Sequence, residues 1–97
     1  MICEVQKNII IDTIMPFHQV KIGIFGSVAR GENTKNSDID ILYQLKDAVG
    51  LLNLVRMKES LEEKLNKKVD LVSEKYLHPK IKHNIINELE IIYNNEK

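Results

Sequence analysis

The sequence of 97 residues contains one cysteine, two prolines and four glycines. A single cysteine cannot form an internal disulfide, so the reducing cytoplasm is the expected compartment. An isolated cysteine near a terminus is more often a small core residue than a nucleophile, and Cys3 is expected in the core. No linker-like composition, repeat or low-complexity block interrupts the chain, which predicts a single domain over residues 1–97.

The sequence also lacks an excess of charge, because 14 Lys and Arg are balanced by 14 Asp and Glu. Without an overall basic field, direct binding to nucleic acid or to anionic membranes is not expected. No apolar run approaches the roughly 18 residues of a membrane span, and Glu4 stands where a signal peptide carries its basic region. A chain of this length has little material to enclose a large substrate, so recognition of one would require a partner.

Hydrophobic periodicity predicts an α/β (α+β) fold in which helices flank a small mixed three-stranded sheet. The element order is α-β-α-β-α-β-α. The expected elements are a helix over 2–15, a strand Val20–Phe25, a short helical turn and loop over 27–36, a strand Ser37–Tyr43, a helix over 50–66, a strand Lys68–Val72 and a helix over 78–94, with Pro79 in its first turn.

About nine residues join the first two strands, which is too few for a parallel crossover. We therefore expect these strands to be antiparallel. The end of the first strand at Gly26 and Ser27 then lies beside the start of the second, where Asp38 and Asp40 stand. Two segments about ten residues apart are thus predicted to form one site.

Asp38 and Asp40 are expected on one face of a strand, roughly 6.5–7 Å apart along the backbone. Two neighbouring carboxylates repel each other, and a divalent cation held by their oxygens offsets this repulsion. Taken alone, the pair is equally consistent with a solvated surface. Asp70, on the third strand, is either a surface charge or a third ligand.

The turn that follows the first strand has the composition of a phosphate-binding segment. Backbone amides at Gly26 and Ser27 and the Ser27 hydroxyl can hold a phosphate, and Arg30 supplies a positive charge. Gly31 permits a backbone conformation that other residues avoid, although a plain turn glycine would do the same.

Together, Gly26-Ser27, Asp38-x-Asp40 and the later strand residue Asp70 resemble the polymerase-beta-type nucleotidyltransferase superfamily. The segment Ala29-Arg30-Gly31, Ser37 and the ending Glu90-Ile-Ile-Tyr93 are similar to its smallest branch, the minimal nucleotidyltransferases, over essentially the whole chain. The resemblance implies the polymerase-beta-like fold and transfer of a nucleoside monophosphate from an NTP, usually ATP, to a hydroxyl.

By position, the resemblance makes Asp38, Asp40 and Asp70 the catalytic residues and the ligands of two Mg²⁺ ions. It places Gly26 and Ser27 at the β and γ phosphates of ATP, with the nucleotide-binding residues Arg30 and Ser37 nearby. Paired metal ions suit this reaction because they stabilise both the attacking and the leaving oxygen.

The resemblance also implies a partner, because minimal nucleotidyltransferases are commonly antitoxins of helical HEPN RNase toxins and add AMP to a toxin tyrosine. A hetero-oligomer is then expected. Two alternatives stay open: a non-catalytic module that neutralises the toxin by contact, and a small-molecule nucleotidyltransferase, which would be expected to carry a second domain. A zinc site is not expected, since His78 and His83 are five residues apart and do not share a helix face.

Overall fold

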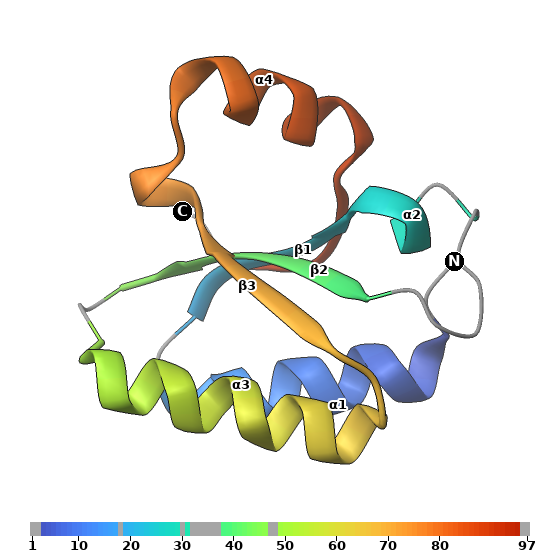
Figure 1. Cartoon of the computed structure of the whole chain (residues 1–97), viewed down its shortest axis with the longest axis vertical. Coiled ribbons are helices and arrows are strands. Elements are labelled where there is room, and N and C mark those ends of the chain that lie inside the picture. The colour runs from blue at the N-terminus through green and yellow to red at the C-terminus, as the bar shows by residue number, and fades with distance from the viewer. Residues whose placement is uncertain (1–2, 18, 30, 32–37, 47–48, 96–97) are drawn as a thin grey trace.

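The structure, a computed structural model, describes residues 3–17, 19–29, 31, 38–46 and 49–95. Figure 1 shows its helices and strands. In chain order they are α1 (Glu4–Ile14), the short 3₁₀ helix η1 (Met15–Phe17), β1 (Gln19–Phe25), α2 (Gly26–Ala29), β2 (Ile39–Leu45), α3 (Leu51–Leu65), β3 (Val69–Ser73), the 3₁₀ helix η2 (Glu74–Tyr76), α4 (Pro79–Glu88) and β4 (Glu90–Asn94).

The strands form one mixed sheet in the order β3-β2-β1-β4. β1 is antiparallel to both β2 and β4, whereas β2 and β3 are parallel. The antiparallel first pair and the mixed sheet predicted from the sequence are therefore confirmed. The helices α1 and α3 cover one face of this sheet, and α4 lies on the other (Figure 1).

The core lies between the sheet and the helices α1 and α3. Ile39 and Ile41 alternate along β2 toward these helices and are 1% and 0% exposed, as the strand pattern predicted. The buried residues of this core are Ile10, Ile14, Ile22, Ile24, Ile39, Ile41, Met57, Leu61, Leu65 and Val69. The opposite, α4-facing side of β2 is thereby left to Asp40, Leu42 and Gln44, because successive side chains of a strand point to opposite faces.

The end of the chain differs from the prediction, because the helix expected over 78–94 stops at Glu88 and a fourth strand follows. Leu89 has an extended backbone (φ −69°, ψ 125°), and β4 then pairs with the free edge of β1. Apolar residues at 85, 89 and 92 fit a helical period, but Ile91, Ile92 and Tyr93 also favour a strand. Pairing satisfies backbone groups along the β1 edge that a longer helix would leave open.

The expectation for Cys3 is also wrong, because its side chain is exposed. Cys3 directly precedes α1, and its backbone N–H donates to Gln6 Oε1 at 3.1 Å, so it caps the helix instead of filling the core. The predicted bounds of α1, β1, β2, α3 and β3 agree with the structure to within two residues at each end. Of the helical turn and loop expected over 27–36, α2 covers the beginning, and most of the remainder lies outside the described residues. Pro79 is the first residue of α4, as expected, and no helix among the described residues is long and apolar enough to cross a membrane.

Candidate active site

The site begins where β1 ends, at Gly26. Gly26 has a φ of +77°, a conformation that residues with a side chain rarely adopt. A Cβ atom at this position would also collide with Oδ2 of Asp40. Asp40 lies on β2 directly after the start of the strand, opposite Phe25. The predicted juxtaposition of the β1 end with the Asp40 segment is therefore present, and it depends on a residue without a side chain at position 26.

Asp70 lies next to Asp40 on the adjoining strand. The parallel pairing of β2 and β3 sets Asp40 opposite Asp70, and residues opposed in this way share a face of the sheet. The backbone N–H of Ile39 donates to the carbonyl oxygen of Lys68 at 2.9 Å, which fixes the two strands at this point. Asp40 and Asp70 thus lie on adjacent strands at one end of the sheet, and Gly26 directly follows the strand on the other side of Asp40.

Asp38 is exposed and stands just before β2. Among the described residues, no three His, Cys, Asp or Glu side chains lie close enough together to hold one metal ion. The set of Asp38, Asp40 and Asp70 is thus brought to one end of the sheet without converging. The donor chemistry nevertheless suits Mg²⁺, which takes oxygen ligands and is commonly bound through one or two carboxylates, several waters and substrate phosphates.

A fourth carboxylate, that of Glu88, reaches the site from the end of α4. Glu88 Oε1 accepts a hydrogen bond from the backbone N–H of Gly26 at 3.0 Å. The amide expected to face a phosphate is therefore engaged by a carboxylate oxygen in this structure. Sequence reasoning missed Glu88, because 62 residues separate it from Gly26 and nothing in the local pattern distinguishes it from a solvated helix residue.

The remaining predicted nucleotide-binding residues are only partly described. Ser27 lies in α2, one residue after the turn at Gly26. Arg30 and Ser37 fall outside the described residues. Gly31 has a φ of +73°, so the unusual backbone conformation expected there is present. The contacts of these residues with a nucleotide stay predictions.

Comparison with known proteins identifies the family of this chain. Residues 8–97 match the model of the family described as polymerase beta, nucleotidyltransferase. The chain belongs to this family and is a nucleotidyltransferase. It is 46% identical over 86 residues to a Methanocaldococcus jannaschii protein described as a protein adenylyltransferase, covering 88% of this chain and 90% of the relative. Identity with the protein adenylyltransferase MntA of Thermococcus cleftensis is 38% over 69 residues, covering 71% of this chain and 70% of the relative.

Solved structures show the same fold. A structure described as a minimal nucleotidyltransferase superposes with a TM-score of 0.78 at 32% identity, covering 89% of this chain and 88% of that one. A toxin–antitoxin complex with AMP-PNP gives a TM-score of 0.82 at 23% identity, covering 91% and 73%. The complex of a tri-AMPylated Shewanella oneidensis HEPN toxin with its MNT antitoxin gives 0.76 at 19% identity, covering 94% and 71%.

Proposed function

We propose that this nucleotidyltransferase is an antitoxin that moves AMP from ATP to a tyrosine hydroxyl of a partner HEPN toxin. The observation that carries the proposal is that Gly26 at the end of β1, Asp40 on β2 and Asp70 on β3 lie side by side at one end of the sheet. The proposal is supported by relatives that are described as protein adenylyltransferases. It is also supported by structural neighbours that occur in toxin–antitoxin complexes.

In this mechanism Asp38, Asp40 and Asp70 would hold two Mg²⁺ ions. When bound, these ions would supply charge stabilisation for the attacking and the leaving oxygen of an in-line displacement. The turn after β1 orients the triphosphate: Ser27 contacts the β and γ phosphates, while Gly26 gives the close approach to Asp40 that a side chain would block. Arg30 and Ser37 complete the nucleotide contacts.

The reaction joins the tyrosine oxygen to the α-phosphorus of ATP and breaks the bond from that phosphorus to the bridging oxygen of the β phosphate. Pyrophosphate leaves with the electron pair of this bond. The phenol proton is lost to a carboxylate on the acceptor side, and we assign this role to Asp70, which would help to activate the incoming hydroxyl. Asp70 lies on the edge strand β3 and is exposed, so an acceptor can approach it from solvent.

An acceptor on the surface of a folded protein fits the openness of this site. Asp38 and Asp70 are exposed, and Asp40 is half-buried. A tyrosine carried by a partner can therefore reach the carboxylates without entering a closed cavity. The partner then supplies most of the recognition surface, as the sequence led us to expect.

The direct test is to incubate the chain with Mg²⁺, ATP and its HEPN partner, for which the product of the adjacent gene is the first candidate. Intact-mass spectrometry should detect one or more AMP increments on the partner, and tyrosine should carry them. Asp40→Asn should abolish transfer, whereas Glu63→Gln, an exposed carboxylate on α3, should leave it unchanged. Equal suppression of the toxin by wild type and Asp40→Asn, with no mass change, would establish the non-catalytic binding module instead.

A second test measures metal binding apart from transfer. Asp40→Asn removes one charge from a group of carboxylates, so the melting temperature of the metal-free variant should hold or rise. Mg²⁺ should stabilise the wild type by about 2.7 kcal/mol at 100 times its Kd, and Asp40→Asn much less. If Mg²⁺ shifts both melting temperatures equally, Asp40 is not a metal ligand.

A further inference from the structure

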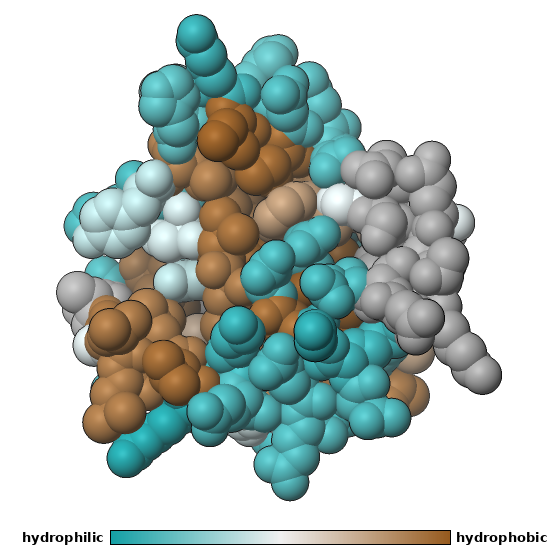
Figure 2. All heavy atoms as spheres, in the orientation of Figure 1, coloured by the Kyte–Doolittle hydropathy of each residue, from teal (hydrophilic) through white to brown (hydrophobic). Residues whose placement is uncertain are grey.

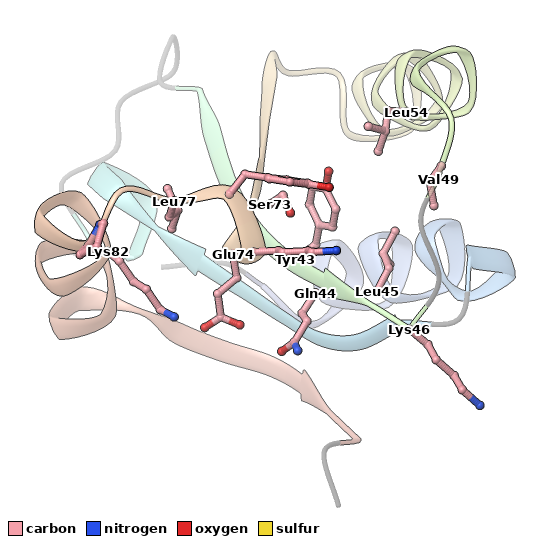
Figure 3. Close-up of a pocket in the computed structure, with 13 residues that line it drawn as sticks. Tyr43, Gln44, Leu45, Lys46, Val49, Leu54, Ser73, Glu74, Leu77 and Lys82 are labelled. Atoms are coloured by element: carbon pink, nitrogen blue, oxygen red, sulfur yellow. The ribbon is translucent and has the colours of Figure 1, made fainter.

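A groove of about 560 Å³ opens at the end of the sheet where β2 and β3 finish, away from the carboxylates. It is bounded by the last residues of β2, the first turn of α3, η2 and the first half of α4 (Figure 3). Its lining residues include Tyr43, Gln44, Lys46, Glu74 and Lys82. A volume of this size falls in the range of natural binding pockets, about 300–1,000 Å³.

The described residues that line the groove carry a net positive charge. Glu74 is the one carboxylate among the described lining residues, and Lys21 neutralises it through an ion pair of 2.7 Å. Lys46, Lys75 and Lys82 also line the groove, and no ion pair is found for any of them in the described part of the chain. These three ammonium groups therefore favour an anionic occupant.

Gln44, which lines the groove, carries an unsatisfied polar atom. Oε1 of Gln44 is buried and has no hydrogen-bond partner among the described residues. Figure 3 shows the side chains of Gln44, Glu74 and Lys82 directed toward the same space. A buried carbonyl oxygen without a donor is costly, so rotation of the Gln44 amide toward an occupant that brings an N–H or O–H group is favoured.

Apolar side chains continue the groove onto the start of α3. Leu51, Leu52 and Val55 are exposed by 78%, 64% and 43%, and Val49 and Leu54 line the groove beside them. Figure 2 shows this apolar surface gathered where α3 begins. Monomeric proteins rarely leave such neighbouring large apolar residues uncovered unless the surface binds something.

From these features we infer that the groove docks an acidic, amphipathic segment of a partner protein. Acidic side chains would pair with Lys46 and Lys82, a peptide N–H would donate to Gln44 Oε1, and apolar side chains would cover Leu51 and Leu52. Single-stranded RNA could match the positive charge but would leave the leucines exposed to water, so a protein segment is favoured.

The identity of the partner rests on the proposed function, and the groove lies on the same face of the sheet as the active site. Gln44 and Asp40 are four residues apart on β2 and therefore share one face of the sheet, roughly 13 Å apart. A protein interface commonly covers about 800 Å² on each partner. A HEPN partner whose tyrosine enters at Asp40 can therefore extend over the same face as far as the groove.

Charge reversal tests the inference. Lys46→Glu with Lys82→Glu should weaken binding of the HEPN partner by roughly 10- to 100-fold, because like charges would face its acidic segment. The salt dependence of the affinity should also diminish. Binding of Mg²⁺ with AMP-PNP should not change. Lys64→Glu, on the opposite side of the sheet, is the matched control. Lys46→Glu alone changes one exposed residue and should leave the fold intact, so it should weaken binding even if the double variant misfolds.

A substitution of the buried amide gives an independent measurement. Gln44→Leu removes an unsatisfied oxygen from the free chain but also the acceptor for the partner. The melting temperature of the free chain should therefore rise while partner affinity falls. If Gln44 had a purely structural role, the melting temperature and the partner affinity would change in the same direction. That result would show that Gln44 does not contact the docked segment.

The outcomes separate the docking surface from the chemistry. Groove-dependent binding of a partner that gains no AMP supports the docking surface and refutes the proposed transfer. Unchanged affinity and unchanged AMP transfer by the charge-reversed variant refute the docking surface alone. Loss of binding to a short single-stranded RNA in this variant, with partner affinity intact, would make the groove an RNA site and overturn the inference.

Discussion

Replacing Gly26 by alanine tests the geometric basis of the active site. Two effects combine at this position: the φ of +77°, and the collision of a new Cβ with Asp40 Oδ2. Gly31 separates them, because its φ of +73° is similar but no atom of the described residues lies within 4 Å of the place where a Cβ would stand. The variant pair Gly26→Ala and Gly31→Ala therefore isolates the cost of displacing the Asp40 carboxylate.

The magnitudes follow from the two effects. A left-handed conformation costs an L-residue roughly 1–2 kcal/mol, and alanine recovers about 0.4–1 kcal/mol by restricting the unfolded chain. Gly31→Ala should thus lose about 0.5–1 kcal/mol of the free energy of unfolding. Gly26→Ala should lose about 1–3 kcal/mol more, because a close-packed side chain or the backbone must move to relieve the collision.

Urea unfolding followed by circular dichroism measures these differences, and each 1 kcal/mol should lower the melting temperature by about 4–8 °C in a domain of this size. Gly50→Ala provides a baseline, since Gly50 has a φ of −63° and a Cβ there would meet no atom of the part of the chain that the structure describes. If Gly26→Ala and Gly31→Ala agree to within about 0.5 kcal/mol, the contact between Gly26 and Asp40 is not constrained as described.

Two further predictions concern Glu88 and Tyr43. Glu88→Ala should lower the free energy of unfolding by about 1.5–3 kcal/mol and speed hydrogen exchange at the Gly26 amide. Glu88→Gln keeps a hydrogen-bond acceptor, so it should retain most of the stability and most of the protection from exchange. Identical exchange in the wild type and both variants would refute the hydrogen bond from Gly26 to Glu88. Burial raises the pKa of the Tyr43 phenol above 10.0, despite its hydrogen bond with Ser73. The unfolded chain loses this proton first, so the resulting stability is complete below about pH 10 and declines as the pH rises through the folded pKa. In Tyr43→Phe the melting temperature should therefore fall less steeply with pH above about 10 than in the wild type. An equal slope in both proteins would contradict the raised pKa of Tyr43.

The sequence was most informative where short-range patterns decide the structure. The short connection between the first two strands was enough to predict their antiparallel pairing, and this pairing placed Gly26 beside Asp40. The alternation of Ile39 and Ile41 identified the core face of β2. These features depend on local spacing, which a single sequence displays directly.

The sequence was least informative where distant segments meet. Residues 90–94 carry a pattern compatible with a helix or a strand, and the open edge of β1 decides between them. Glu88 becomes part of the site only because α4 ends beside the turn at Gly26. The groove likewise combines residues from β2, α3, η2 and α4, and no local pattern predicts such a combination.

The connection between α3 and β3 sets the position of Asp70 by chain length. α3 stops at Asn66, which takes a left-handed conformation with a φ of +54°, and Val69 N–H is held by Glu62 Oε2 at 3.0 Å. Only residues 66–68 separate the helix from the strand. Insertion or deletion of a single residue here would shift the β2–β3 register and turn Asp70 to the opposite face of the sheet. The number of residues in the loop 66–68 therefore sets the distance between the carboxylates of Asp40 and Asp70, although neither residue belongs to that loop.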